Sequence, residues 1–365
     1  MRWLVLPVLL ILFCTSVYAQ PQVRLGGSLE ETELGEIADI AEDKYDIDLK
    51  GLIGEIINGN TDFDIGEGLI SVFFNELESN ASFIKGILLI CILNGLVATA
   101  MEGFADRDVV QTAYFAAFAA VAGMLVSGYK LCADVLTEGA ADTAELLSAS
   151  TPLILSLVSA GGSGGAAAGF SVVLSLAAGI LNSLIGTLIV PQFTFAVMLG
   201  LLNCLWDRGM VGRLAELFAF LAKWELKICA FIFAACLALG RLGGGVVSGT
   251  VGKGVKLAVG TVPVVGDLFE NSIEAVVSFV GALKGGVAVA LIIIITLSAG
   301  TKLIKLCAVM LLYKLTSAVT EPMGSKKITE MIDCAAEGIK LLIGAYFTLI
   351  ITFITAVVVM LGSLS

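Results

Sequence analysis

Long apolar runs separated by short charged segments make up most of the chain. Residues 82–101 and 112–131 each carry a single lysine and have the length that an α-helix needs to cross a bilayer core of ~30 Å. Similar runs recur further along the chain, at residues 151–206, 227–240, 287–299, 303–319 and 339–361. The pattern predicts an all-α, polytopic helical membrane protein with about seven or eight spans.

Residues 151–206 are almost uncharged but contain two interruptions. One is the GGSGG segment with Gly161, Gly162, Gly164 and Gly165, and the other is Pro191. Glycine clusters and proline at membrane depth indicate helix breaks or discontinuous helices. The run is compatible with two crossings or with three.

Two further stretches have helical spacing but carry charge. Asp134, Glu138, Asp142 and Glu145 recur in an Ala/Leu-rich stretch, which indicates a helix that lies at the membrane interface or packs against other helices. Residues 208–227 form an amphipathic connector, whose excess of arginine and lysine favours a cytoplasmic face.

Residues 261–286 predict a long helix that carries the chain's clearest polar stripe. Pro263 suits the first helical turn, and the glycines at 285 and 286 suit its end. The polar residues recur every three or four positions, so they share one narrow face: Asp267, Glu270, Asn271 and Glu274. This stripe faces a cavity or a partner, or the helix lies flat with its acids in water. The sequence leaves both open.

The amino-terminal part of the chain is acidic. Residues 1–19 have the basic start, short apolar core and small residue Ala19 of a secretory signal peptide, with an uncleaved anchor as the alternative. Residues 20–82 carry 15 acids and three bases among apolar residues at helical spacing. We expect a short, helical, extracytoplasmic segment that serves as a contact surface, followed by the membrane domain at residues 83–365.

The amino-acid composition narrows the range of chemical functions that the chain can perform. Hydrophobic residues make up 58% of the chain, charged residues 15%, and histidine is absent, so histidine-dependent catalysis and metal binding are excluded within this chain. The net charge of −11 argues against nucleic acid as a partner. The cysteines are scattered without a CxxC pair, and the glycine-rich segment near Lys253 lacks the pattern of a phosphate-binding loop. We therefore expect no catalytic residues, no cofactor and no metal site.

Two short motifs carry a resemblance to a known family. They are VPVVG at residues 262–266, followed by Phe269, and EPMG at residues 321–324. Together with the order of the apolar and acidic segments, they resemble the stage III sporulation protein AE family of endospore-forming bacteria. The family pattern lies at Pro263, Val264, Val265, Gly266 and Phe269, which implies a structural role for these residues.

The resemblance implies a function for the whole chain. Its members are expected to be integral membrane components of a channel or secretion-like complex that links mother cell and forespore and is needed for forespore development. The expected location is the outer forespore membrane of the mother cell. The expected partners are the lipid bilayer, the other proteins of the stage III membrane complex and a forespore-side protein, and the chain itself could form a homo-oligomer.

Two other function classes are weighed against this one. A secondary transporter, a permease for an unknown small solute, also uses interrupted helices, although buried ion-coupling residues and an internal repeat are not convincing in this sequence. An enzyme would need paired carboxylates or a Ser-Lys dyad inside the membrane, and no spacing singles one out.

Charge reversal tests the polar stripe. If it faces a cavity or a partner, replacing Asp267 and Glu270 by Lys abolishes complex assembly and sporulation while the protein stays inserted and abundant, because the reversed charges are poorly screened there. Gly266→Leu is the matched packing control, since it leaves the charge unchanged. Normal function of the reversed stripe beside a damaging Gly266→Leu would show that the helix only packs.

Overall fold

A computed structural model describes residues 73–79, 85–87, 89, 92, 107–160, 178–205, 211–242, 286–323 and 326–361. These residues form helices and no strand, which confirms the predicted all-α class for this part of the chain. The predicted signal peptide, most of the acidic segment and most of residues 82–101 lie outside the described residues. So do the GGSGG segment and the predicted stripe helix.

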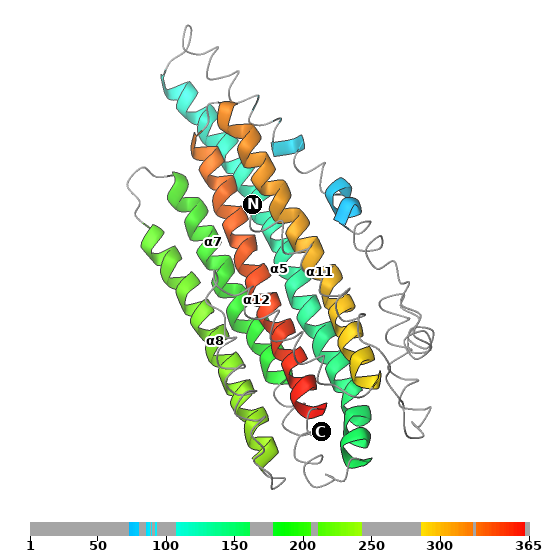
Figure 1. Ribbon diagram of the computed structural model, residues 1–365. Coiled ribbons are helices and arrows are strands. Elements are labelled where there is room, and N and C mark those ends of the chain that lie inside the picture. The colour runs from blue at the N-terminus through cyan, green and yellow to red at the C-terminus, as the bar shows by residue number, and fades with distance from the viewer. Residues whose placement is uncertain are drawn as a thin grey trace.

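Five long helices lie side by side in an elongated bundle (Figure 1). Their bounds are Arg107–Ala160 for α5, Val190–Leu205 for α7, Gly212–Leu242 for α8, Gly286–Thr320 for α11 and Lys326–Leu361 for α12. Successive long helices run in opposite directions. Figure 1 therefore shows the ends of α5, α8 and α12 together with the start of α11 at one end of the bundle.

Helix α12 is the centre of the bundle, since it packs against α5, α7, α8 and α11. Between Ile328 and Val357 most of its apolar side chains are fully buried, including Tyr346 and Phe353. A helix that is apolar on all sides is stable only when other helices or lipid surround it. The strong apolar run predicted at residues 339–361 is thus the innermost part of the fold.

Helix α11 corrects the interpretation of two separate apolar runs at residues 287–299 and 303–319. Both runs belong to one continuous helix of 35 residues. The polar residues between them, among them Lys302, do not end the helix, because lysine is a good helix former and the Lys302 side chain contacts carboxylates on α5.

Four helices in the described part of the chain are long and apolar enough to cross a membrane. They are Phe115–Pro152, Ala178–Cys204, Ser298–Thr320 and Lys326–Ile354. The chain is therefore a polytopic helical membrane protein. The described residues do not confirm the predicted seven or eight spans.

Helix α5 joins two segments that the sequence pattern separated. The apolar run at residues 112–131 continues without a break into the stretch with the four acids. That stretch packs in the bundle, where Leu136, Ala140 and Leu147 are buried, as the packed alternative predicts. At 1.5 Å per residue, its 54 residues measure about 80 Å, far more than a ~30 Å bilayer core, so α5 extends beyond the membrane.

Pro191 was predicted to interrupt its helix, and this is wrong. The chain is helical from Ala178 to Leu205, with a π-helical turn at Ile185–Ile189 directly before the proline. Proline has no N–H and its ring collides with the carbonyl group four residues earlier. In the wider turn, the Val190 N–H donates to the Ile185 carbonyl oxygen, and the helix continues through the proline.

Helix α8 unites the predicted amphipathic connector and the following apolar run in 31 residues. Its inner face packs against α7 and α12 through Ala222, Leu226 and Phe233. Leu217, Trp224 and Phe231 on the opposite face are exposed. The chain between α11 and α12 is short: a 3-10 turn occupies Glu321–Met323, and α12 begins at Lys326.

The bundle predicts a specific effect of enlarging Gly338. A Cβ atom at this position of α12 would collide with the side chain of Val197 on α7, and it would lie 3.1 Å from Tyr129 Cε2 on α5. We expect Gly338→Ala to destabilise the protein by about 1–3 kcal/mol, as overpacking of a core does. The measurement is the unfolding temperature in detergent.

Gly123→Ala is the matched control, because nothing lies within 4 Å of a Cβ atom built at Gly123. This variant should unfold at or slightly above the parent temperature, since alanine favours the helix. Equal effects of the two substitutions would show that α12 is not packed as closely as described.

Candidate functional site

The candidate site residues and the family motif around Pro263 that the sequence indicated lie outside the described part of the chain. This holds for the polar stripe of Asp267, Glu270, Asn271 and Glu274 and for the glycines of the GGSGG segment. It also holds for the family motif at Pro263, Val264, Val265, Gly266 and Phe269. Their proposed roles remain predictions. The structure instead brings together charged residues that sequence reasoning did not connect.

The first charged cluster joins α5 to α11. Lys302 Nζ on α11 lies 2.8 Å from Glu138 Oε1 and 3.4 Å from Asp142 Oδ2 on α5. The side chains of Lys302 and Asp142 are each only 17% exposed. A lysine on one helix thus bridges two acids that are one turn apart on its neighbour.

All three residues belong to helices that qualify as membrane spans. A charged side chain in the hydrocarbon region is unfavourable by several kcal/mol unless it meets an opposite charge or water. Glu138 and Asp142 are four residues apart and therefore share one face of α5, and α11 presents Lys302 to that face. The cluster pairs these charges with one another, with Lys302 and Asp142 mostly buried and Glu138 exposed, and it fixes the register of α5 against α11.

A cavity of about 410 Å³ lies beside this cluster. Residues of α5, α11 and the helical segment 73–79 line it. Lys305 Nζ lies at its edge, 3.9 Å from Glu76 Oε2. The lining combines an apolar wall with charged residues: Leu131, Val135, Leu306, Val309 and Leu312 form the wall, and Glu76, Asp134, Glu138 and Lys305 are charged.

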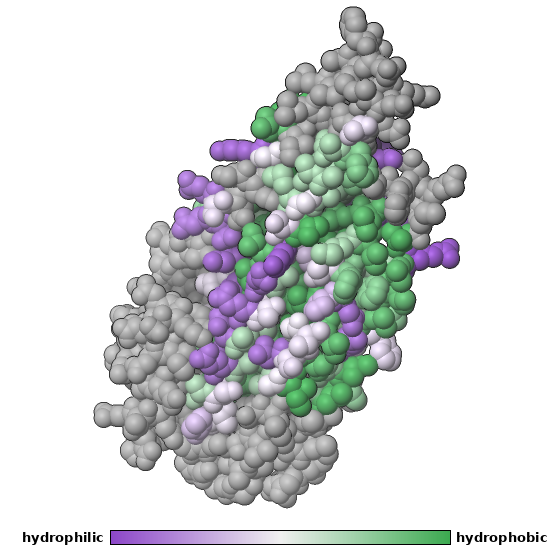
Figure 2. Space-filling view, turned by 180° about the vertical axis from the view of Figure 1, so that it is seen from behind, coloured by the Kyte–Doolittle hydropathy of each residue, from purple (hydrophilic) through white to green (hydrophobic). Residues whose placement is uncertain are grey.

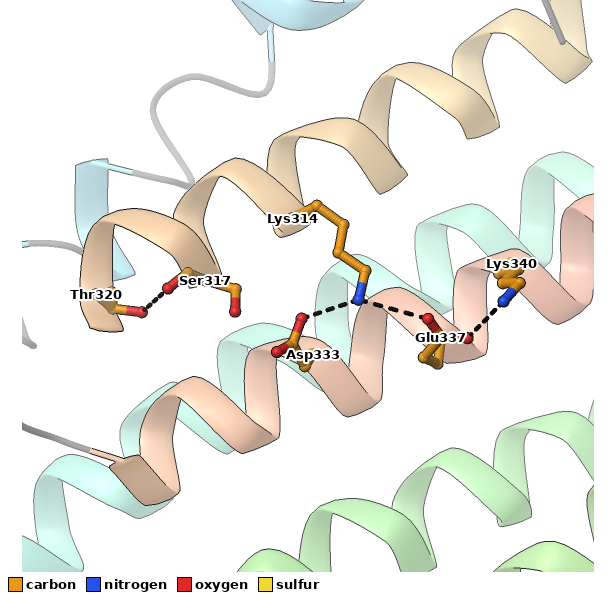
Figure 3. A network of polar contacts seen from close by, with 6 residues as sticks. All are labelled: Lys314, Ser317, Thr320, Asp333, Glu337 and Lys340. Carbon is orange, nitrogen blue, oxygen red and sulfur yellow. Dashed lines mark hydrogen bonds and ion pairs between the residues drawn. The ribbon is translucent and has the colours of Figure 1, made fainter. Parts of the chain in front are cut away.

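The second charged cluster joins α11 to α12 (Figure 3). Lys314 Nζ donates to Asp333 Oδ1 at 2.9 Å and lies 3.4 Å from Glu337 Oε1. The other oxygen of Glu337 accepts from Lys340 Nζ at 3.0 Å. Figure 3 shows Lys314 reaching from α11 between the two carboxylates, so Glu337 is shared by two lysines.

A third polar contact joins α7 to α8. Gln192 Nε2 donates to both carboxylate oxygens of Glu225, each at 2.8 Å. In the space-filling view, hydrophilic residues form a band along the bundle beside a broad hydrophobic area (Figure 2). Polar pairs therefore occur in three helix contacts: α5 with α11, α11 with α12, and α7 with α8.

Several serine and threonine hydroxyl groups of the bundle are occupied within their own helices. Thr143, Ser150 and Thr348 each donate to the carbonyl oxygen four residues earlier. In the part of the chain that the structure describes, no group of three or more Cys, Asp or Glu residues could hold a metal ion. The charged clusters are suited to holding helices together and to contacting a polar molecule in the cavity.

Part of the first cluster could have been found in the sequence. The acids at 134, 138 and 142 have the spacing of one helix face, and Lys302 stands between two apolar runs, with Lys305 near the start of the second. The sequence could not show that Lys302 pairs with Asp142, because about 160 residues separate them. A contact between two antiparallel helices also leaves no pattern in the sequence of either helix.

The helices and clusters define a class: a multi-pass, all-helical membrane protein whose helices are joined by ion pairs. The sequence pattern of the family described as Stage III sporulation protein AE matches residues 47–363. The chain belongs to the stage III sporulation protein AE family. It is 23% identical over 324 residues to Stage III sporulation protein AE of Bacillus subtilis (strain 168), covering 87% of this chain and 81% of that protein. No solved structure matches it.

Removing Lys302, the lysine of the first cluster, is expected to lower the stability of the protein. Lys302→Met leaves Asp142 mostly buried without its cation and is expected to destabilise the protein by about 3 kcal/mol, near the lower end for a broken buried pair. Asp142→Asn in the same chain removes the unpaired charge and should restore part of the stability. The unfolding temperatures of the two single variants and the double variant show how strongly Lys302 and Asp142 interact.

Lys326→Met is the surface control. Its ion pair with Glu330 is 3.9 Å long and its side chain is 90% exposed, so we expect a change below about 0.5 kcal/mol. Strictly additive effects of the Lys302 and Asp142 substitutions would contradict a direct interaction between these residues.

Proposed function

We propose that this protein is an integral membrane subunit of the channel or secretion-like complex that links mother cell and forespore, and that it is needed for forespore development. The single observation that carries the proposal is its membership of the stage III sporulation protein AE family over most of its length. The proposed location is the outer forespore membrane. The proposed partners are other stage III membrane proteins and a forespore-side protein.

The bundle supports a role as an assembly subunit. Helices α7 and α8 leave large apolar side chains exposed along their outer faces, among them Phe195, Leu202 and Trp224. Helix α5 is also far longer than a bilayer is thick. A membrane subunit of a larger complex needs such surfaces for lipid and for neighbouring proteins.

The remaining segments extend this proposal. We propose that residues 1–19 are a signal peptide and that the acidic residues up to 82 form an extracytoplasmic contact surface. We also propose seven or eight spans in total, because residues 82–101, residues 227–240 and the remainder of the uncharged run at 151–206 are apolar in addition to the four candidate helices. Catalysis has no part in the proposal, since the composition offers no histidine and the sequence shows no catalytic pattern.

A secondary transporter is the second candidate, and one observation favours it. The cavity between α5 and α11 combines apolar walls with carboxylates and a lysine, and it lies beside an ion pair within two candidate spans. Transporters place substrate and coupling ions at such positions. The two candidates differ in whether the chain acts alone.

Reconstitution separates them. Liposomes that contain only this purified protein should show no saturable uptake of amino acids, sugars or organic anions, because an assembly subunit needs its partners. Purification from sporulating cells under mild detergent should recover other stage III membrane proteins with it. Lys302→Met with Asp142→Asn serves as the matched variant for any uptake that is seen.

Saturable uptake by the chain alone that depends on Lys302 and Asp142 would overturn the proposal in favour of a transporter. Recovery of the chain without any other stage III membrane protein would count against the assembly role.

A further inference from the structure

The charged residues of α8 and α12 stop at a common level, whereas the paired charges of Lys302, Glu138 and Asp142 on α11 and α5 lie beyond it. On α12 no Asp, Glu, Lys or Arg follows Lys340 up to the helix end at Leu361, and on α8 none lies between Lys227 and Gly240. The 21 residues after Lys340 measure about 31 Å, which matches the hydrocarbon core of a bilayer. The uncharged segment after Lys227 on α8, which extends to Gly240 before Arg241, and the uncharged segment after Lys340 on α12 lie towards the same end of the bundle (Figure 1).

Three lysines mark this level: Lys223 and Lys227 on α8 and Lys340 on α12. Lys340 contacts Glu337, but that carboxylate is shared with Lys314. Within the described residues, Lys223 and Lys227 make no ion pair within 4 Å. Burial lowers the pKa of Lys223, and the charges of Lys340 and Lys227 lower it further, whereas Glu337 opposes the shift. The lysines thus form a site with more positive than negative charge.

An apolar stripe lies directly beside these lysines on α8. Leu221, Trp224, Ile228 and Phe231 follow one another at spacings of three and four residues, so they share one face of the helix. All four are exposed, with Trp224 at 55% and Phe231 at 51%. Tryptophan is enriched where the bilayer core meets the headgroups.

We propose that Lys223, Lys227 and Lys340 bind the phosphate of an anionic phospholipid, whose acyl chains lie along Trp224, Ile228 and Phe231. The phosphate adds negative charge to a site where Glu337 is shared between Lys314 and Lys340. The stripe continues from the lysines along the uncharged segment of α8, which is the direction that acyl chains take into the bilayer core. Free phosphate would use the same lysines but would gain nothing from the stripe.

The test compares lipids on the purified full-length protein in detergent. Native mass spectrometry measures binding of phosphatidylglycerol and of phosphatidylcholine with the same acyl chains. Each lysine beside an anionic headgroup is worth roughly a fivefold change in affinity. We therefore expect phosphatidylglycerol to bind the parent on the order of tenfold more tightly than phosphatidylcholine, and Lys223→Gln with Lys227→Gln to remove the difference.

Three further measurements complete the design. Lys130→Gln on α5 is the matched charge control and should leave the lipid preference unchanged, because Lys130 is an exposed lysine away from the α8 stripe. Trp224→Ser should weaken phosphatidylglycerol binding while the three lysines remain. The double lysine variant should unfold in phosphatidylcholine at or above the parent temperature, since it loses the repulsion between Lys223 and Lys340.

Equal binding of the two lipids by the parent would overturn the proposal. A loss of preference in Lys130→Gln as large as in the double variant would show only a general effect of net charge, and would overturn it too. Stabilisation by inorganic phosphate alone that equals the effect of phosphatidylglycerol and is insensitive to Trp224→Ser would assign the site to a free anion instead.

Discussion

The ion pair between Lys302 and Asp142 expresses the constraint on which this bundle depends: a charge within a span must meet its opposite inside the protein. Both side chains are mostly buried, and they belong to different spans. An unpaired charge there would be costly, so α5 and α11 have one favourable register and orientation. Apolar packing alone would define that register less sharply, because leucine, valine and isoleucine side chains are nearly interchangeable in such a contact.

Helix α12 adds a second constraint, because it packs against the four other long helices. Its sequence alternates bulky residues with small ones, and Gly338 lets Val197 and Tyr129 approach from two sides. Its charges are confined to the first half, where Asp333 and Glu337 meet Lys314 of α11. The same helix thus supplies the polar contacts near one end of the bundle and the apolar core towards the other.

The sequence predicted the helical class, the membrane location and the innermost run at residues 339–361, because these depend on local composition. The sequence prediction failed at two positions where contacts in the folded structure outweigh the local preference of the residue. Pro191 does not break its helix because a π turn precedes it, and Lys302 does not separate two spans because α5 supplies acids for it. The charged clusters were not predicted, since a pairing between helices depends on tertiary structure. The predicted stripe at Asp267 to Glu274 lies in a part of the chain that the structure does not describe.

The two charged clusters lie on different sides of α11, and this bears on how the subunit could change shape. Lys302 contacts α5 and Lys305 contacts Glu76 of the helical segment 73–79, whereas Lys314 reaches α12. A small rotation of α11 about its axis would therefore have to break contacts on both sides at once. Sliding of α11 along its own axis would also break these contacts, because each lysine pairs with acids at one position along the neighbouring helix. Helix α11 is thus tied to its two neighbours, while α8 is attached along one face only and exposes the other. Movement or assembly within the bundle is therefore expected at α8 before it is expected at α11.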